Sequence, residues 1–214
     1  MGDACDRVLG DNLPSLDDVL DHTPAGDFFM DCDDIEEDYR RICRKEGVDP
    51  RDENPKQHAM AEANAREQAR DAYEEATFEI GRLFEKSDRV TIYREMYVDN
   101  ASIFIDSLFE HGKTMYRGEM RGVGTYWSWE RGGAFAYCGH GVGTPIILVS
   151  TAGCDDLDIE MMIGDYMQFS SSKSIMRERE NEVNLLDGRP IVIEQILTRY
   201  GKNLIEGRTI PAWT

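Results

Sequence analysis

The feature that most constrains this chain is a long run rich in Ala, Glu and Arg, residues 56–86, which is free of glycine over most of its length. Within it Tyr73, Ala76, Ile80 and Phe84 recur at steps of three and four residues. That spacing places apolar side chains along one side of a helix, so the run predicts an amphipathic helix. The first part of the chain is therefore expected to be helical.

Shorter helices are expected before this run. Ser15 can cap the start of a helix, with Asp18 three residues later as in a capping box. A second helix is expected over residues 33–46, because a glycine follows directly and ends it. Two prolines and five charged residues then make residues 48–56 a linker. Together these signals predict an acidic, helical region over residues 1–88.

The acidic character is concentrated toward the N-terminus. The 214 residues include 42 acidic and 24 basic side chains, which gives a formal net charge of −18. Residues 1–60 hold 17 of the acids and 7 of the bases, a net charge of −10. Binding to nucleic acid or to anionic lipid needs a basic face, so direct binding to either is not expected. The acidic region is better suited to a basic partner.

The first residues, the apolar runs and the cysteines indicate the cellular compartment in which the protein is expected. The first residues lack the basic and apolar segments of a signal peptide, and no run of about 20 apolar residues could span a membrane. Five scattered cysteines without metal-ligand spacing suggest free thiols in a reducing compartment, and no metal site. We therefore expect a cytoplasmic protein, or one delivered into a host cytoplasm.

From Val90 onward β-branched and aromatic residues become frequent, and the sequence predicts an α+β region. The expected elements are a strand over 89–98, a capped helix over 99–112, a strand entering a short helix over 124–141, a strand over 145–151, a helix before Gly164, and two strands over 181–186 and 189–196. Asp187–Gly188 between the last two strands is a turn sequence typical of a β-hairpin.

Three motifs with chemically active side chains follow one another in this second part of the sequence. The first is an Arg at the end of an apolar strand, the second an aromatic strand end with a hydroxyl, and the third a pair of glutamates one residue apart before an apolar strand. The residues are Tyr93 and Arg94; Tyr126, Trp127, Ser128 and Tyr137; and Glu180 and Glu182. Ser128 lies 34 residues after Arg94 and 54 residues before Glu182.

In this order the motifs resemble those of the ADP-ribosyltransferase superfamily, in the branch with an Arg, a Ser/Thr strand and a Glu-x-Glu. The resemblance covers about residues 89–200. It implies a catalytic domain over residues 89–214, built from two small packed β-sheets around an NAD cleft. NAD would be a substrate and a protein the acceptor. The resemblance adds no assignment for residues 1–88.

The resemblance also implies residue roles. Arg94 would anchor the NAD diphosphate, and Ser128 would brace the catalytic Glu182, which holds the 2′-hydroxyl of the nicotinamide ribose. Glu180 would activate the acceptor, an arginine side chain in the first instance. The aromatic residues of the motifs would line the NAD site, namely Tyr93, Tyr126, Trp127 and Tyr137.

Physical chemistry accounts for these residue types. The planar fork of Arg binds phosphate oxygens bidentately. Cleavage of the nicotinamide–ribose bond builds positive charge on the ribose, which a carboxylate stabilises as in glycoside hydrolysis. Residues i and i+2 of a strand face the same side, so Glu180 and Glu182 would point into one cleft. Repulsion between two close carboxylates raises the proton affinity of one, which suits a general base.

Some assignments stay open. Arg117, in Met115–Glu119, is a second candidate for the anchoring arginine, but it leaves only 11 residues before Ser128, and we favour Arg94. Glu178 and Glu180 also form a Glu-x-Glu, although the apolar residues after Glu182 favour the later pair. Tyr126 stands where the family motif often has Ser.

The expected function is thus an NAD-dependent mono-ADP-ribosyltransferase with NAD hydrolysis as a side activity, as in a toxin or a phage effector. Two other classes of function remain open. The acidic region could make the chain a partner-binding protein or a nucleic-acid mimic that inhibits its target. The long helix also suits a structural or assembly protein of a virion, without catalysis.

Overall fold

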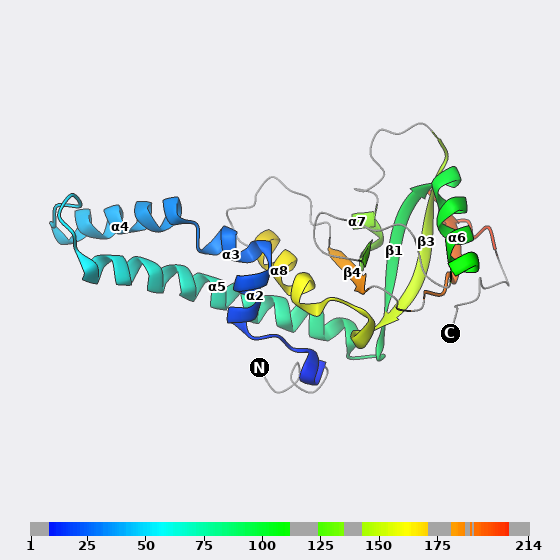
Figure 1. The fold of residues 1–214 in the computed structure, drawn as a ribbon, viewed down its shortest axis with the longest axis horizontal. Coiled ribbons are helices and arrows are strands. Elements are labelled where there is room, and N and C mark those ends of the chain that lie inside the picture. Colours follow the sequence, from blue (N-terminus) through cyan, green and yellow to red (C-terminus); the bar gives the residue numbers. More distant parts are fainter. Residues whose placement is uncertain are drawn as a thin grey trace.

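The computed structural model describes residues 9–111, 124–134, 143–170, 181–186, 189 and 191–205. The chain forms a helical N-terminal part followed by strands and helices that build one sheet (Figure 1). The α+β class expected from the sequence is therefore confirmed.

The N-terminal part is helical, as the sequence predicted. Its elements are η1 (Gly10–Asn12), α2 (Leu16–His22), α3 (Pro24–Phe29), α4 (Cys32–Glu46) and α5 (Pro55–Phe84). The predicted capping box is present, because the Ser15 hydroxyl accepts from the Asp18 amide and the Asp18 carboxylate accepts from the Ser15 amide. Gly47 adopts φ of 71° directly after α4, the left-handed conformation that ends a helix. The sequence missed α3, whose N-terminus Thr23 caps.

Helix α4 packs against the N-terminal half of α5 and forms a helical arm that projects from the remainder of the fold (Figure 1). The arm has a small core of its own, formed by Tyr39, Ile42, Cys43 and Ala61. The Tyr39 ring stacks on His58 of α5, with the ring centres 3.7 Å apart. The arm therefore holds together by contacts separate from those of the main core.

Five strands form a single antiparallel sheet in the order β4-β2-β1-β3-β5. The strands are β1 (Arg89–Tyr97), β2 (Gly124–Ser128), β3 (Pro145–Gly153), β4 (Glu182–Leu186) and β5 (Gln195–Thr198). The expected hairpin between the last two strands is wrong, because β4 and β5 lie at opposite edges of the sheet. Two packed sheets are not seen among the described residues.

Helices connect and cover the strands. They are α6 (Val98–His111), α7 (Arg131–Ala134), the short η2 (Cys154–Asp156) and α8 (Ile159–Ser170). The sequence predicted that the last helix ends before Gly164, but α8 continues through it. A side chain at Gly164 would lie within 2.2 Å of the Thr23 hydroxyl oxygen, so the glycine permits close packing of α8 on the α2–α3 junction.

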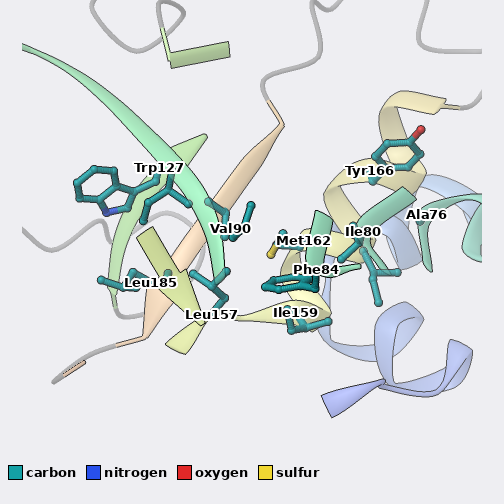
Figure 2. Packing of buried hydrophobic residues seen from close by; sticks show 14 of the residues in the cluster. Ala76, Ile80, Phe84, Val90, Trp127, Leu157, Ile159, Met162, Tyr166 and Leu185 are labelled. Carbon is teal, nitrogen blue, oxygen red and sulfur yellow. The ribbon is translucent and has the colours of Figure 1, made fainter. Parts of the chain in front are cut away.

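One main core joins the N-terminal helices to the sheet. Figure 2 shows Ile80 and Phe84 of α5 and Met162 of α8 on one side, with Val90 and Leu185 of the sheet on the other. Helix α6 adds Ala101 to the same core. The composition boundary near residue 88 thus falls between α5 and β1, and buried residues from both sides of it pack together.

Among the described residues, no helix combines the length and the apolar character needed to cross a membrane. Cys32, Cys43 and Cys154 are free thiols, and Cys43 is buried in the arm.

Candidate functional site

The sheet places two of the predicted site residues directly opposite each other. Ser128 of β2 pairs with Glu182 of β4 on one side and with Tyr93 of β1 on the other. Residues opposite one another in an antiparallel pair point to the same side of the sheet. Glu182, Ser128 and Tyr93 therefore form a row across three strands, on the face that we call the second face.

The opposite face carries the main core. Ile92, Trp127 and Val183, which alternate with the row residues, are buried there. Because side chains alternate along a strand, Glu95, Tyr126 and Asn184 lie on the second face beside the row. The second face also has a small apolar cluster, made of Ile147, Val149 and Leu197 with Tyr93 packed against it.

Local geometry fixes Ser128 at the end of β2. Its side chain is buried, and its hydroxyl both donates to the Glu130 carbonyl, at 2.9 Å, and accepts from the Glu130 amide, at 3.1 Å. These bonds hold the turn into α7. The Ser128 side chain is therefore held at the start of the turn into α7.

Glu182 is half-buried at the start of β4. Asn181 before it has φ of 46°, a left-handed conformation that asparagine tolerates better than most residues. The Asn181 carbonyl accepts from the Trp129 amide at 3.1 Å, which extends the pairing of β2 with β4 by one bond. The register of Ser128 with Glu182 is thus set on both sides of the pair.

Arg94 has a different environment from the row. It alternates with Tyr93 and so points to the core face, together with Ile92 and Met96. Its Nη1 donates to the carbonyl of Tyr126 on the adjacent strand. The structure therefore places Arg94 one strand away from Ser128 but on the other face of the sheet from Glu182.

The aromatic candidates for the NAD site also lie on different faces of the sheet. Tyr126 is half-buried on the second face, whereas Trp127 is fully buried in the main core (Figure 2). Trp129 packs against that core, and its ring lies parallel to that of Tyr166 on α8, with centres 6.4 Å apart. The structure thus gives Trp127 a packing position. Tyr137, Glu180, Glu178 and Arg117 lie outside the described residues.

A buried carboxylate beside the row was missed by the sequence reasoning. Glu95 is 4% exposed, and neither of its carboxylate oxygens has a hydrogen-bond partner in the described part of the chain. Burial raises the pKa of this carboxyl, and the positive charge of Arg199 partly offsets the increase. The alternation of Tyr93, Glu95 and Tyr97 along β1 is the sequence signal for a polar second face.

Within the described ranges, no group of three or more His, Cys, Asp or Glu side chains is arranged to hold a metal ion. No protein-family model, curated protein or solved structure matched the chain.

Proposed function

We propose that the chain is an NAD-dependent mono-ADP-ribosyltransferase that modifies a protein side chain, with arginine as the first candidate acceptor. The observation that carries the proposal is the pairing of Ser128 with Glu182 on one face of the sheet. The two residues are 54 positions apart in the sequence, and the motif reasoning had assigned them to one site. The cross-strand position brings the two side chains to one face, and a bracing bond from Ser128 to Glu182 would require the hydroxyl to turn from the Glu130 carbonyl to which it donates here.

The chemistry follows from the carboxylate. As the bond between nicotinamide and ribose breaks, its electron pair leaves with nicotinamide and positive charge develops on the ribose. Glu182 stabilises that charge and accepts a hydrogen bond from the ribose 2′-hydroxyl, a bond that strengthens in the transition state. The acceptor side chain then bonds to the ribose, and Glu180 takes the proton that it releases. Water in place of the acceptor gives NAD hydrolysis.

We place the NAD site on the second face of the sheet, beside the half-buried Glu182. The second sheet of the expected cleft is a further part of the proposal. Tyr93 and Tyr126 present rings to this face, which suit contacts with the nicotinamide or adenine. The motifs gave Arg94 or Arg117 as the anchoring arginine. Arg94 lies on the other face of the sheet from Glu182, so the proposal keeps Arg117, which lies outside the described residues. The protein would act in a cytoplasm, its own or that of a host into which it is delivered as a toxin or phage effector.

The test is incubation of the folded chain with labelled NAD and a cell lysate, followed by measurement of protein labelling and of free nicotinamide. Glu182→Gln keeps the shape of the side chain but removes its charge, and we expect it to lower both activities at least 100-fold. Glu194→Gln, a carboxylate bonded to Thr151 at the far edge of the sheet, is the matched control and should retain both. A wild-type protein that binds NAD but neither labels protein nor releases nicotinamide would refute the proposal.

The helical arm favours a second candidate function, that of a partner-binding protein. A surface groove of about 550 Å³ lies along α4 and is lined by Asp33, Glu36, Glu37, Arg40, Arg44 and Pro50. Acidic side chains dominate the first turns of α4, so a basic partner is expected. Replacing Asp33, Glu36 and Glu37 by their amides should abolish capture of that partner and leave NAD hydrolysis unchanged. If hydrolysis is absent while capture depends on these carboxylates, partner binding is the function.

A further inference from the structure

The outer face of α4 carries two blocks of opposite charge, one after the other. The inner face, with Tyr39 and Ile42, packs on α5. The helical residues that line the groove on the outer face are Asp33, Glu36, Glu37, Arg40 and Arg44. The acidic ones lie in the first half of α4 and the arginines in the second half. The outer face is therefore acidic at one end and basic at the other.

This division decides which kind of partner fits the groove along its whole length. A uniformly basic partner is attracted to the acidic half of α4 and repelled by the arginines of the other half. The complement of the groove has the same two blocks in reverse order. A second copy of α4 that runs antiparallel presents that order. A symmetric pair of this kind is self-complementary, because each contact occurs twice.

The facing residues of such a pair can be read from the sequence. Once Glu37 of one copy lies against Arg40 of the other, the antiparallel direction sets the register of the whole helix. The facing pairs are then Glu37 with Arg40, Asp33 with Arg44, and Glu36 with Arg41. Each joins a carboxylate to a guanidinium, and no like charges face one another among them.

The charged groups that this pairing needs are on the surface. Asp33, Glu37, Arg40 and Arg44 are exposed. In the described part of the chain, the carboxylates of Asp33 and Glu37 have no ion-pair partner. Arg40 is bonded to Glu36 at 3.0 Å, but the two side chains are 61% and 39% exposed. An exposed pair within a helix contributes little, so Arg40 can exchange it for a contact with another copy at small cost.

The shape of the molecule reduces the repulsion between two copies, each of which has a net charge of −18. The N-terminus of α4 joins the remainder of the fold, and its C-terminus lies toward the tip of the arm (Figure 1). In an antiparallel pair the two bodies therefore lie at opposite ends of a helix about 22 Å long. Exposed charges are largely screened beyond about 8 Å at physiological salt, so the facing pairs outweigh the repulsion between the bodies.

We propose that the outer face of α4 is a self-association site, at which the arms of two copies pair antiparallel and form a symmetric dimer. This inference rests on the second candidate function, partner binding by the arm, and it identifies the partner as a second copy of the chain. It does not depend on the transferase reaction. Because the contacts are exposed ion pairs, the dimer is weak and depends on salt.

The experiment is sedimentation equilibrium of the full chain over a range of concentrations, at low salt and at about 1 M salt, where the screening length is about 3 Å. We expect a dimer at low salt and a monomer at high salt. Glu37→Arg and Arg40→Glu each place like charges opposite one another twice, and each should weaken dimerisation at least tenfold. An equimolar mixture of the two variants restores both pairs and should dimerise as the wild type does. Glu67→Arg makes the same charge reversal on the exposed surface of α5 and is the matched control.

The outcomes separate this inference from the functions proposed above. Wild-type protein that stays monomeric at low salt refutes the second copy as the partner. If the α4 carboxylates are then still needed to capture another protein, partner binding stands without self-association. A dimer that both variants leave intact refutes the site on α4, and a mixture that stays monomeric refutes the antiparallel register. NAD hydrolysis in the same samples tests the transferase independently, and thermal unfolding establishes that each variant is folded.

Discussion

The contact between α8 and the junction of α2 with α3 leads to a specific prediction for Gly164→Ala. The added Cβ would lie 2.2 Å from Thr23 Oγ1 and 2.6 Å from Thr23 Cβ. Thr23 cannot simply rotate away, because its hydroxyl donates to the Val19 carbonyl at 2.7 Å and accepts from the Ala25 amide at 3.2 Å. The substitution must therefore displace a helix or break the cap between α2 and α3.

The magnitude follows from three contributions. Overpacking of a closely packed contact costs about 1–3 kcal/mol. Loss of the Thr23 cap would cost about 1 kcal/mol more. Alanine favours the helix over glycine by about 1 kcal/mol, which offsets part of the cost. We expect the free energy of unfolding to fall by about 2 kcal/mol, which for a chain of this size lowers Tm by about 4–8 °C.

The assay is thermal and urea unfolding followed by far-UV circular dichroism. Gly132→Ala is the matched control, because a Cβ on this α7 glycine would meet no atom within 4 Å. It should leave Tm unchanged or raise it slightly. Thr23→Gly combined with Gly164→Ala should restore part of the lost stability, since it removes the side chain that clashes. A Gly164→Ala protein as stable as the wild type would show that α8 does not pack on Thr23 in this way.

Three further predictions concern stability. Burial raises the pKa of Glu95, so the stability that this carboxyl contributes is complete below its ordinary pKa of 4.5 and is lost as pH rises through the raised value. The Tm of Glu95→Gln should therefore increase relative to that of the wild type as pH increases. A difference in Tm that stays constant with pH would contradict this. Ile42→Ala opens a cavity in the arm and should cost about 2 kcal/mol locally, seen as faster amide hydrogen exchange in α4 but not in the sheet. The hydrogen bond from the Ser15 hydroxyl lowers the pKa of Asp18, so Ser15→Ala should lower Tm at pH 7. The difference should become smaller once acid protonates Asp18, and the remainder reports the bond from the Asp18 amide to the Ser15 hydroxyl; a difference that does not change with pH would argue against the contribution of the carboxylate.

The helices were the most predictable part of the fold. Their apolar spacing, the Ser15 cap and the Gly47 stop are local signals, and the structure contains each of them. The failure at Gly164 has a non-local cause. The glycine is required by Thr23, more than 100 residues away, and not by the end of a helix.

Strand order was the least predictable part. Asp187–Gly188 is a favourable hairpin turn, yet β4 pairs with β2 and β5 with β3. Turn residues report local preference, whereas strand order depends on which faces the core can bury. For the same reason the sequence could predict only part of the candidate site. The motifs identified Ser128 and Glu182, but only the register shows that they share a face and that Arg94 lies on the other. Nothing in the sequence marks Arg199, because its position beside Glu95 depends on the order of three strands.

The continuity of α5 gives the molecule a mechanical property. The helix has 30 residues and is about 45 Å long, and its two ends belong to different cores. Ala61 near one end lies in the arm, and Phe84 at the other lies in the main core with Val90 of β1. A force applied at the arm is therefore transmitted along a stiff rod to the strand that carries Tyr93 and Glu95. A partner bound to the arm is thus connected to β1 through one continuous helix, with no ligand near the row.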